Sequence, residues 1–272
     1  PLVRPPAPAP GEAWLRLLDV GQGLSAVVRT ADHTLVYDTG PGFSSGFNAG
    51  SAVVLPYLRE VGVDRVDTLV LSHGDRDHTG GLAGLVAGVE VARVLAGEPE
   101  EVGDPRVEPC RAGQRWRWDG VEFVILHPDG AGLSGNDSSC VLRVSAAGAS
   151  LLLPGDIGRR VEAELVADRA EELASTLLVA AHHGSATSSS RAFLEAVDPR
   201  WVLYASGYAD RFGFPSRVVR ERVAALGARE LDTARTGAIW FALTAAGLEG
   251  PRLYRRDHRR LWRPVDAGPV PF

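Results

Sequence analysis

Four short apolar runs, far apart in this chain, each end in an aspartate or a histidine. They are residues 34–38 (TLVYD), 68–73 (TLVLSH), 151–156 (LLLPGD) and 177–183 (LLVAAHH). Sheets usually place their sites at the carboxyl ends of strands. Carboxylates gathered there without a partner would repel each other and cost several kcal/mol if buried. The pattern therefore predicts a fold in which distant strand ends meet around a positively charged ligand.

The richest of these strand ends is residues 72–81, SHGDRDHTGG. We expect an extended segment, in which His73, Asp75 and Asp77 at alternate positions lie on one side. His78 follows where the chain can turn into a helix. Imidazoles and carboxylates in this combination are ligands of divalent metal ions. A solvated charged turn would explain any one of these residues, but not the same pattern at four strand ends.

The remaining patterns alternate strands with helices, and they place two sheets face to face with helices outside. With 272 residues, of which 45% are hydrophobic, the chain can bury a sizeable core, and it has no apolar run near 18 residues that would span a membrane. We expect strands at residues 14–20, 24–29, 34–38, 68–71, 91–95, 121–126, 140–144, 150–153, 176–180, 201–204, 238–243 and 247–254, and helices at residues 52–61, 158–170 and 216–226, after Gly81 and after Ser190.

The domain organisation follows from composition. We expect a Pro-rich linker at residues 1–12, one domain at residues 13–254 and an Arg-rich tail at residues 255–272. The chain contains no Met, so we expect it to be part of a longer protein. The net charge of −5 argues against a general polyanion-binding surface. The tail, which interleaves Tyr254 and Trp262 with arginines, could hold a nucleic-acid strand, dock on a membrane domain or be a solvated terminus.

Two further expectations concern single side chains. Cys110 and Cys140 are an even pair that could form a disulfide in an oxidising compartment. We expect two free core thiols, with the disulfide as the alternative. His33, His127 and His258 fall in apparent turns or in the tail, and we expect them at the surface.

Taken together, the motifs SHxDxDHxGG, VYDTG, PGD and HHGS resemble the metallo-β-lactamase fold superfamily. The segments LDVGQG, NDSS, HHGSATSSS, RFGFP and TARTGAI resemble, more narrowly, the C-terminal domain of the ComEC family of bacterial competence proteins. The resemblance covers residues 14–250. It implies an α/β (α+β) fold, a four-layer αββα sandwich of two mixed sheets with flanking helices.

The resemblance also implies a site with two divalent metal ions. It assigns His73 and Asp75 to the first ion, Asp77, His78 and His182 to the second, and Asp156 to a bridge between them. Asp75 stands where the superfamily usually has His, and Asn136 and Asp137 stand where it has a third His. Oxygen-rich ligands favour Mn²⁺ or Mg²⁺ over Zn²⁺, so we expect Mn²⁺, with Zn²⁺ and Mg²⁺ as the alternatives.

Other residues take supporting roles in this interpretation. Asp38 orients a ligand, and His183 either replaces His182 as a ligand, contacts a phosphate or is structural. Ser185 and Thr187 bind a phosphate at the start of the next helix, or they belong to an ordinary Ser-rich cap. Gln22 and Asn136 contact the substrate.

The expected activity is hydrolysis of a phosphodiester between two ions, with Asp77 positioning the attacking water and moving its proton. The resemblance implies a nuclease that degrades the non-transported strand during DNA uptake. It would act on single-stranded DNA beside a membrane channel domain of the same longer chain, on the periplasmic face of the inner membrane. The alternatives are a non-catalytic DNA-guiding module, a stand-alone metallo-hydrolase of small esters and a purely structural domain.

Overall fold

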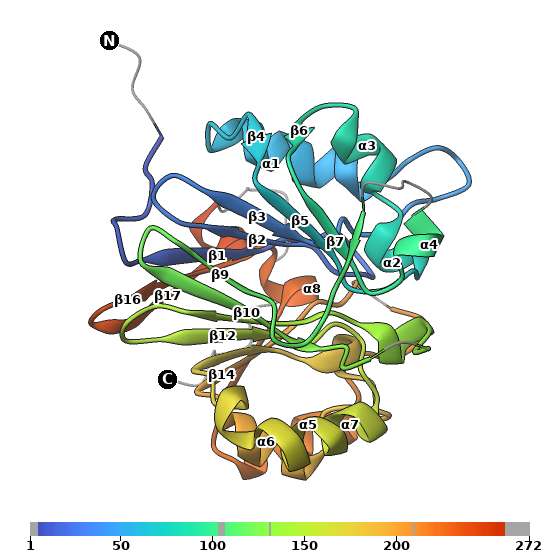
Figure 1. Ribbon diagram of the computed structural model, residues 1–272, viewed down its shortest axis with the longest axis vertical. Helices are drawn as coiled ribbons and strands as arrows, with labels where there is room; N and C mark the ends of the chain where they lie inside the picture. The colour runs from blue at the N-terminus through green and yellow to red at the C-terminus, as the bar shows by residue number, and fades with distance from the viewer. Residues whose placement is uncertain (1–4, 103–106, 131, 209, 259–272) are drawn as a thin grey trace.

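The apolar runs of the sequence become the strands of two large sheets packed face to face in the computed structural model (Figure 1). The structure describes residues 5–102, 107–130, 132–208 and 210–258. Within them, the first sheet has eight strands, in the order β17 (Gly247–Leu253), β16 (Ile239–Thr244), β1 (Ala13–Leu17), β2 (Ala26–Arg29), β3 (Thr34–Tyr37), β5 (Thr68–Leu71), β7 (Val94–Ala96) and β8 (Glu108–Pro109).

The second sheet contains seven strands within the same residues. Their order is β15 (Arg229–Asp232), β14 (Trp201–Tyr204), β13 (Leu177–Val179), β12 (Ser150–Leu153), β11 (Val141–Ser145), β10 (Val121–His127) and β9 (Arg115–Trp118). A small separate pair joins β4 (Arg65–Val66) to β6 (Glu90–Val91).

Both large sheets are mixed. In the first, strands β17 to β3 pair antiparallel and strands β3, β5, β7 and β8 pair parallel. In the second, strands β9 to β12 pair antiparallel and strands β12 to β15 pair parallel. Each sheet therefore has a parallel half, and four strands of these halves, β3, β5, β12 and β13, lead into the residues that the sequence marked.

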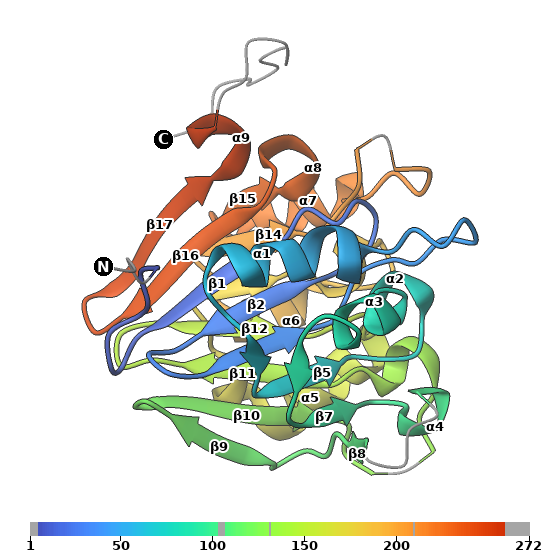
Figure 2. The same cartoon turned by 90° about the horizontal axis from the view of Figure 1, so that it is seen from above.

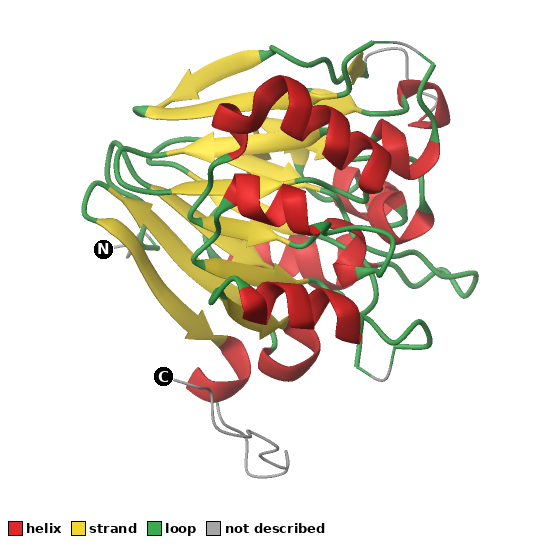
Figure 3. Cartoon of the chain, turned by 90° about the horizontal axis from the view of Figure 1, so that it is seen from below, coloured by secondary structure: helices red, strands yellow, loops and turns green. Residues whose placement is uncertain are grey.

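Helices cover the outer faces of both sheets (Figure 1), and Figure 3 shows those that cover the second sheet. Strand β1 shows the pattern of a sheet with a core on one side, since its alternate residues Ala13, Leu15 and Leu17 are fully buried. The main core lies between the sheets, and a further core lies under the helices of each outer face. The expected four-layer sandwich is confirmed. Its helices are η1 (Gly50–Val54), α1 (Leu55–Glu60), α2 (Arg76–Thr79), α3 (Leu82–Val86), α4 (Pro99–Val102), η2 (Gly135–Ser138), α5 (Arg159–Leu173), η3 (Ala181–Gly184), α6 (Arg191–Val197), α7 (Arg217–Ala225), α8 (Thr233–Thr236) and α9 (Tyr254–Asp257).

Four strands escaped the sequence analysis: β4 and β8, of two residues each, and the longer β9 and β15. Strand β9 reads RWRW, and its tryptophans pack on the core while its arginines face outward. Strand β15 reads RELD and buries Leu231 and Asp232. These short runs have too few apolar residues to stand out, and pairing with a neighbouring strand, β10 for β9 and β14 for β15, defines each of them as a strand.

The expectation of two free thiols is wrong. Cys110 and Cys140 form a disulfide, with their Cα atoms 5.8 Å apart. The sheet order explains the pairing, because Cys110 follows β8 in the first sheet and Cys140 precedes β11 in the second. The expectation that His127 lies at the surface is also wrong. It is 4% exposed at the end of β10, and its Nε2 is 2.8 Å from the carbonyl oxygen of Asp137.

The ends of the domain stay predictions. Residues 1–4 of the expected linker and residues 259–272 of the expected tail lie outside the described residues, as does Trp262. The described start of the tail includes α9, in which Arg255 forms an ion pair with Asp19 at 2.7 Å. In the described part of the chain, no helix has both the length and the apolar content of a membrane span.

Candidate metal centre

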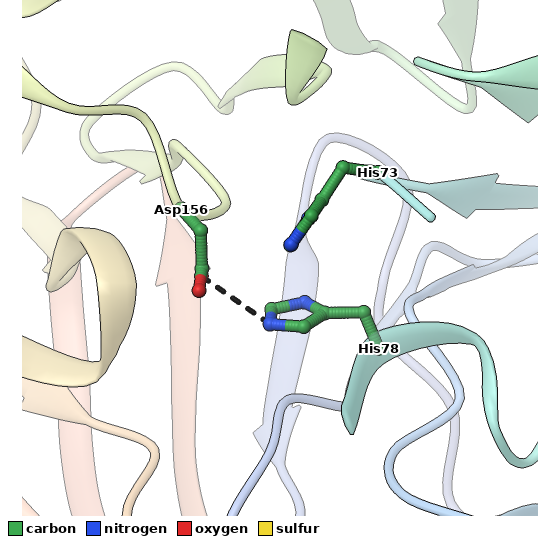
Figure 4. A group of neighbouring side chains, drawn as sticks. All are labelled: His73, His78 and Asp156. Carbon is green, nitrogen blue, oxygen red and sulfur yellow. Dashed lines mark ion pairs between the residues drawn. The ribbon is translucent and has the colours of Figure 1, made fainter. Parts of the chain in front are cut away.

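Side chains from both sheets converge at one end of the sandwich. Asp38 follows β3 and His73 follows β5 of the first sheet, while Asp156 follows β12 and His183 follows β13 of the second. Figure 4 shows His73, His78 and Asp156 pointing toward one another from separate segments. Adjacent parallel strands deliver their last residues to one edge, and the facing sheets bring the two edges together.

Two overlapping groups of ligand atoms form there. His73, His78 and Asp156 offer atoms that all lie within 4.8 Å of one another, and so do Asp77, His78 and His183. His78 belongs to both groups. Its Nε2 is 3.3 Å from Asp156 Oδ1 and 3.2 Å from His183 Nε2. The two groups therefore form one continuous cluster, in which each group could contact a cation.

Each of the three buried imidazoles is held through Nδ1. His78 Nδ1 donates to Asp38 Oδ2 at 2.8 Å, and His183 Nδ1 donates to the carbonyl oxygen of Ala205 at 2.8 Å. His73 Nδ1 lies 3.0 Å from Ser72 Oγ, which itself donates to Asp38 Oδ2 at 2.8 Å. A proton on Nδ1 leaves the lone pair on Nε2, so all three rings direct a ligand atom into the cluster.

Two buried atoms of the cluster have no hydrogen-bond partner among the described residues. They are His73 Nε2 and Asp156 Oδ1. Buried polar atoms are nearly always satisfied, and an unpaired one costs about 1–3 kcal/mol. Nitrogen and oxygen atoms that converge unpaired at one point fit a divalent cation, which accepts both donor types. The residues present therefore fit the metal ions that the sequence motifs imply.

The charges of the cluster support the same conclusion. Burial raises the pKa of the Asp156 carboxyl, but the nearby His78 and His183 outweigh burial and hold that pKa well below its ordinary value. Burial likewise acts to raise the pKa of Asp77, yet the hydrogen bond with His183 and the charge of His78 lower it to about 2. Both carboxylates are thus ionised at neutral pH. Without a metal ion, protonated His78 and His183 balance their charge; a bound cation would do so instead and leave the imidazoles neutral.

The expected extended segment at residues 73–77 is wrong beyond Asp75. Helix α2 begins at Arg76, so Asp77 reaches the cluster from the first helical turn. Asp75 instead lies at the mouth, with its side chain 62% exposed and its Oδ2 3.4 Å from His73 Nε2. A helix places alternate residues on different faces, and this separates the two aspartates.

The structure places His183, more than His182, inside the cluster. His183 Nε2 is 3.2 Å from Asp77 Oδ2 and 3.5 Å from Asp156 Oδ2, and its side chain is 2% exposed. His182 Nε2 is 3.8 Å from Asp156 Oδ2, and its side chain is 25% exposed. Both histidines have positive φ, so the chain turns sharply and points the two rings in different directions.

The expected substrate-binding residues surround His182 and the adjoining loop. Asn136 Nδ2 and Thr187 Oγ1 lie 3.4 Å and 3.5 Å from His182 Nδ1. Ser185 is buried, and its hydroxyl is 2.9 Å from that of Thr187. Gln22 accepts a hydrogen bond from the amide of Gly207 at 3.3 Å. These four residues therefore form the rim of the cluster and its second layer, not the ligand groups.

Some functional residues lay within quoted motifs without receiving a role. Ser72 connects Asp38 to His73, and Ser139 Oγ accepts from the amide of Asp156 at 3.0 Å. Gly81 also has a role, because a Cβ atom there would lie 2.1 Å from the carbonyl oxygen of Thr39. This glycine lets the turn after α2 pack against the end of β3. The sequence could have indicated these roles, since serine and glycine recur beside the ligand residues in these motifs.

Comparison with known proteins gives a family match over much of the chain. Residues 18–207 match the family model described as the metallo-beta-lactamase superfamily. The chain is 42% identical over 261 residues, or 96% of its length, to Competence protein ComA of Neisseria gonorrhoeae. It is 32% identical over 223 residues, or 82% of its length, to Recombination protein 2 of Haemophilus influenzae. The chain spans only 36% and 28% of the lengths of these two relatives.

A solved structure with a similar fold is the metallo-beta-lactamase fold protein YhfI of Bacillus subtilis. The TM-score is 0.56 at 12% sequence identity, and the match covers 85% of this chain and 99% of that one. At this identity the likeness concerns the fold alone. It agrees with the two mixed sheets and the outer helices described above.

Proposed function

Since this chain belongs to the metallo-beta-lactamase superfamily, as its motifs predicted, we propose that it is a metal-dependent phosphodiesterase that cuts single-stranded DNA. The observation that carries the proposal is the convergence of His73, His78, His183 and Asp156 around buried, unpartnered ligand atoms. The competence name of the relative that matches 96% of the chain supports DNA as the substrate.

The residues of the cluster divide between two proposed divalent ions, with Mn²⁺ favoured. His73 would hold one ion, with Asp75 near its open side, and Asp77, His78 and His183 would hold the other. Asp156, whose two oxygens face His78 and His183, would bridge the ions. His182 stands at the rim in this assignment. Bound divalent ions supply Lewis acidity, which activates water near neutral pH and offsets the charge of a phosphodiester.

Asp77 is the residue that we assign to proton handling. Its side chain is 36% exposed, whereas Asp156 is 5% exposed, so Asp77 can reach both the cluster and solvent. Its low pKa keeps the carboxylate ionised, and its Oδ2 contacts His183 Nε2. An ionised carboxylate in this position can orient a water molecule and accept its proton.

We place the domain beside a membrane channel of a longer protein, on the periplasmic face of the inner membrane, where it would degrade the strand that is not transported. The long relatives, of which this chain spans about a third, support a neighbouring domain. The Cys110–Cys140 disulfide supports the location, because such bonds persist in oxidising compartments.

The test is cleavage of labelled single-stranded DNA by the purified chain with Mn²⁺. We expect Asp77→Asn to lower the cleavage rate by about 100-fold or more, because the side chain keeps its size but loses its charge and its basicity. Asp64→Asn, at an exposed position, is the matched control and should cut as the parent does. Equal cleavage by Asp77→Asn and the parent would trace the activity to a contaminant.

A DNA-guiding module without catalysis is the second candidate. It is favoured by the exposed Asp75 and by Asn136 in the place of a third histidine, since both leave the first ion with few firm ligands. This candidate predicts DNA binding that survives chelation, together with no cleavage under any divalent ion. A result of that kind would replace the nuclease assignment.

A further inference from the structure

Two loops project from the end of the molecule that carries the candidate centre (Figure 2). One is residues 41–48, between β3 and η1, and the other comprises the described residues 205–208 and 210–216, between β14 and α7. Each contains exposed phenylalanines: Phe43 and Phe47 are 53% and 55% exposed on the first loop, and Phe212 is 55% exposed on the second. Large apolar side chains held in solvent at the rim of a site indicate a surface for a ligand.

The loop of residues 205–216 carries an aromatic stack that starts at the centre. The ring of Phe214 packs 6.2 Å from that of His183, with 26° between the planes. Phe212 continues the stack, with its centroid 5.5 Å from Phe214 and 18° between the planes. Arg211 places its guanidinium carbon 4.6 Å from the centroid of Phe212. We call Phe214, Phe212 and Arg211 the aromatic ladder.

The ladder is held in place by its own loop. The Asp210 carboxylate accepts hydrogen bonds from the amides of Phe212 and Phe214, at 3.1 Å and 2.9 Å. A Cβ atom on Gly184, next to His183, would lie 2.6 Å from Pro215. The ladder therefore sits directly against the turn that carries the histidine pair. Phe212 is exposed to solvent, while Phe214 stays fixed against His183.

The loop of residues 41–48 projects from the same end of the molecule (Figure 2). It is a short hairpin in which the amide of Phe43 donates to the carbonyl oxygen of Phe47, and the two rings lie 5.7 Å apart. Arg76 of α2 donates to the carbonyl oxygen of Gly42 at 3.1 Å, which fixes this hairpin beside Asp77. Exposed aromatic groups thus stand on two loops at the end of the molecule that carries the candidate centre.

On the basis of the proposed function, we propose that the aromatic ladder, together with Phe43 and Phe47 of the loop of residues 41–48, stacks the unpaired bases of a DNA strand and so sets the preference for single strands. Bases stack on exposed phenylalanines irrespective of sequence, and an arginine over a ring adds affinity for the strand. In a duplex the faces of the bases are covered by their neighbours. A single strand can place its bases on the ladder while its backbone reaches the centre.

Binding of fluorescent strands to the 272-residue chain, measured by anisotropy with EDTA present so that the strand stays intact, tests this proposal. The probes are a thymidine strand, an abasic strand of equal length and a duplex. The parent should prefer the thymidine strand to the other two. Phe212→Ala should weaken binding of the thymidine strand by about 10-fold and leave binding of the abasic strand unchanged.

Two further variants sharpen the test. Phe212→Trp keeps a stacking ring and should restore the affinity for the thymidine strand. Val218→Ala, at an exposed position on the following helix α7, should bind as the parent does. Unchanged binding of the thymidine strand by Phe212→Ala, or equally tight binding of the duplex by the parent, would overturn the proposal.

The two proposals fail in different experiments. Cleavage with Mn²⁺ tests the phosphodiesterase, and anisotropy without divalent ions tests the ladder. A parent chain that binds the thymidine strand through Phe212 but never cuts it contradicts the first proposal and supports the second. If the parent chain cuts DNA and Phe212→Ala binds the thymidine strand as tightly as the parent, the first proposal is supported and the second is contradicted.

Discussion

At the scale of single residues, the candidate centre depends on Asp38. Its carboxylate accepts hydrogen bonds from the amide and the hydroxyl of Ser72 and from His78 Nδ1. Asp38 is fully buried and has positive φ, a conformation that Asp and Asn tolerate better than other side chains do. One carboxylate thus orients His78 directly and His73 through Ser72.

We expect Asp38→Asn to weaken Mn²⁺ binding by about 10- to 100-fold, as loss of a partner to a metal-binding histidine generally does. The amide keeps the shape and tolerates the backbone conformation, so the fold should survive. Its NH₂ group cannot accept from His78 or Ser72, and the rings should lose their orientation. Calorimetric titration with Mn²⁺ measures the effect, with Asp64→Asn as the control. Equal affinities for the two variants would remove Asp38 from this role.

At the scale of elements, Glu162 joins helix α5 to the start of helix α6. This fully buried carboxylate accepts hydrogen bonds from the amides of Ser189 and Ser190. Ser190 itself caps α6 through its hydroxyl, which accepts from the amide of Phe193. The segment after the histidine pair is therefore fastened to α5 by one acidic side chain.

Burial raises the pKa of Glu162 above its ordinary value, against the opposing hydrogen bonds of Ser190 and Ser189 and the charge of Arg222. The folded protein thus holds this proton more tightly than the unfolded chain. The contribution of Glu162 to the free energy of unfolding is largest at low pH. It decreases as pH rises from about 4.3, the ordinary Glu value, to the raised pKa of the folded state.

Glu162→Gln should remove that decrease from the pH profile. The variant should also have a lower free energy of unfolding at every pH. Its side-chain NH₂ group is a donor and cannot accept the hydrogen bond that the amide of Ser189 or Ser190 donates to the carboxylate. Urea unfolding across the acidic range measures the slope. Glu164→Gln, on the exposed side of the same helix, should keep the slope of the parent. Parallel profiles for the parent and Glu162→Gln would contradict the assignment.

At the scale of the whole molecule, the candidate centre connects the two sheets. His73 and His78 belong to segments after β5 in the first sheet, and Asp156 and His183 follow strands of the second. A cation that binds the folded chain alone stabilises it by mass action, by about 2.7 kcal/mol at a hundred times the dissociation constant. An ion bound by these residues would contact side chains from both sheets and so stabilise their packing at this end of the molecule.

We therefore expect saturating Mn²⁺ to raise the melting temperature by about 5 °C, the shift that such a gain gives in a domain of this size. Asp156→Asn should lose most of the increase, because it removes a carboxylate that contacts both His78 and His183. Differential scanning calorimetry with and without EDTA measures it, and Asp64→Asn should behave as the parent. Equal shifts in Asp156→Asn and the parent would place the ion elsewhere.

The sequence was sufficient for the four layers and for most residues of the centre. Apolar periodicity is a local property, and the polar residue that ends a strand is read directly from the chain. Strands β4, β8, β9 and β15 were not predicted, because each has at most four residues and few apolar side chains. Pairing with a neighbouring strand defines them.

The tertiary structure decided what depends on distance and direction. It brought Cys110 to Cys140, separated Asp75 from Asp77 by starting a helix at Arg76, and turned His183 inward. It also set Phe212 and Phe214 against the histidine pair. Backbone turns and sheet packing fix where a side chain points, and these depend on contacts across the whole fold. The sequence alone thus indicated which groups are candidates for the centre, and only the folded chain decided which of them meet.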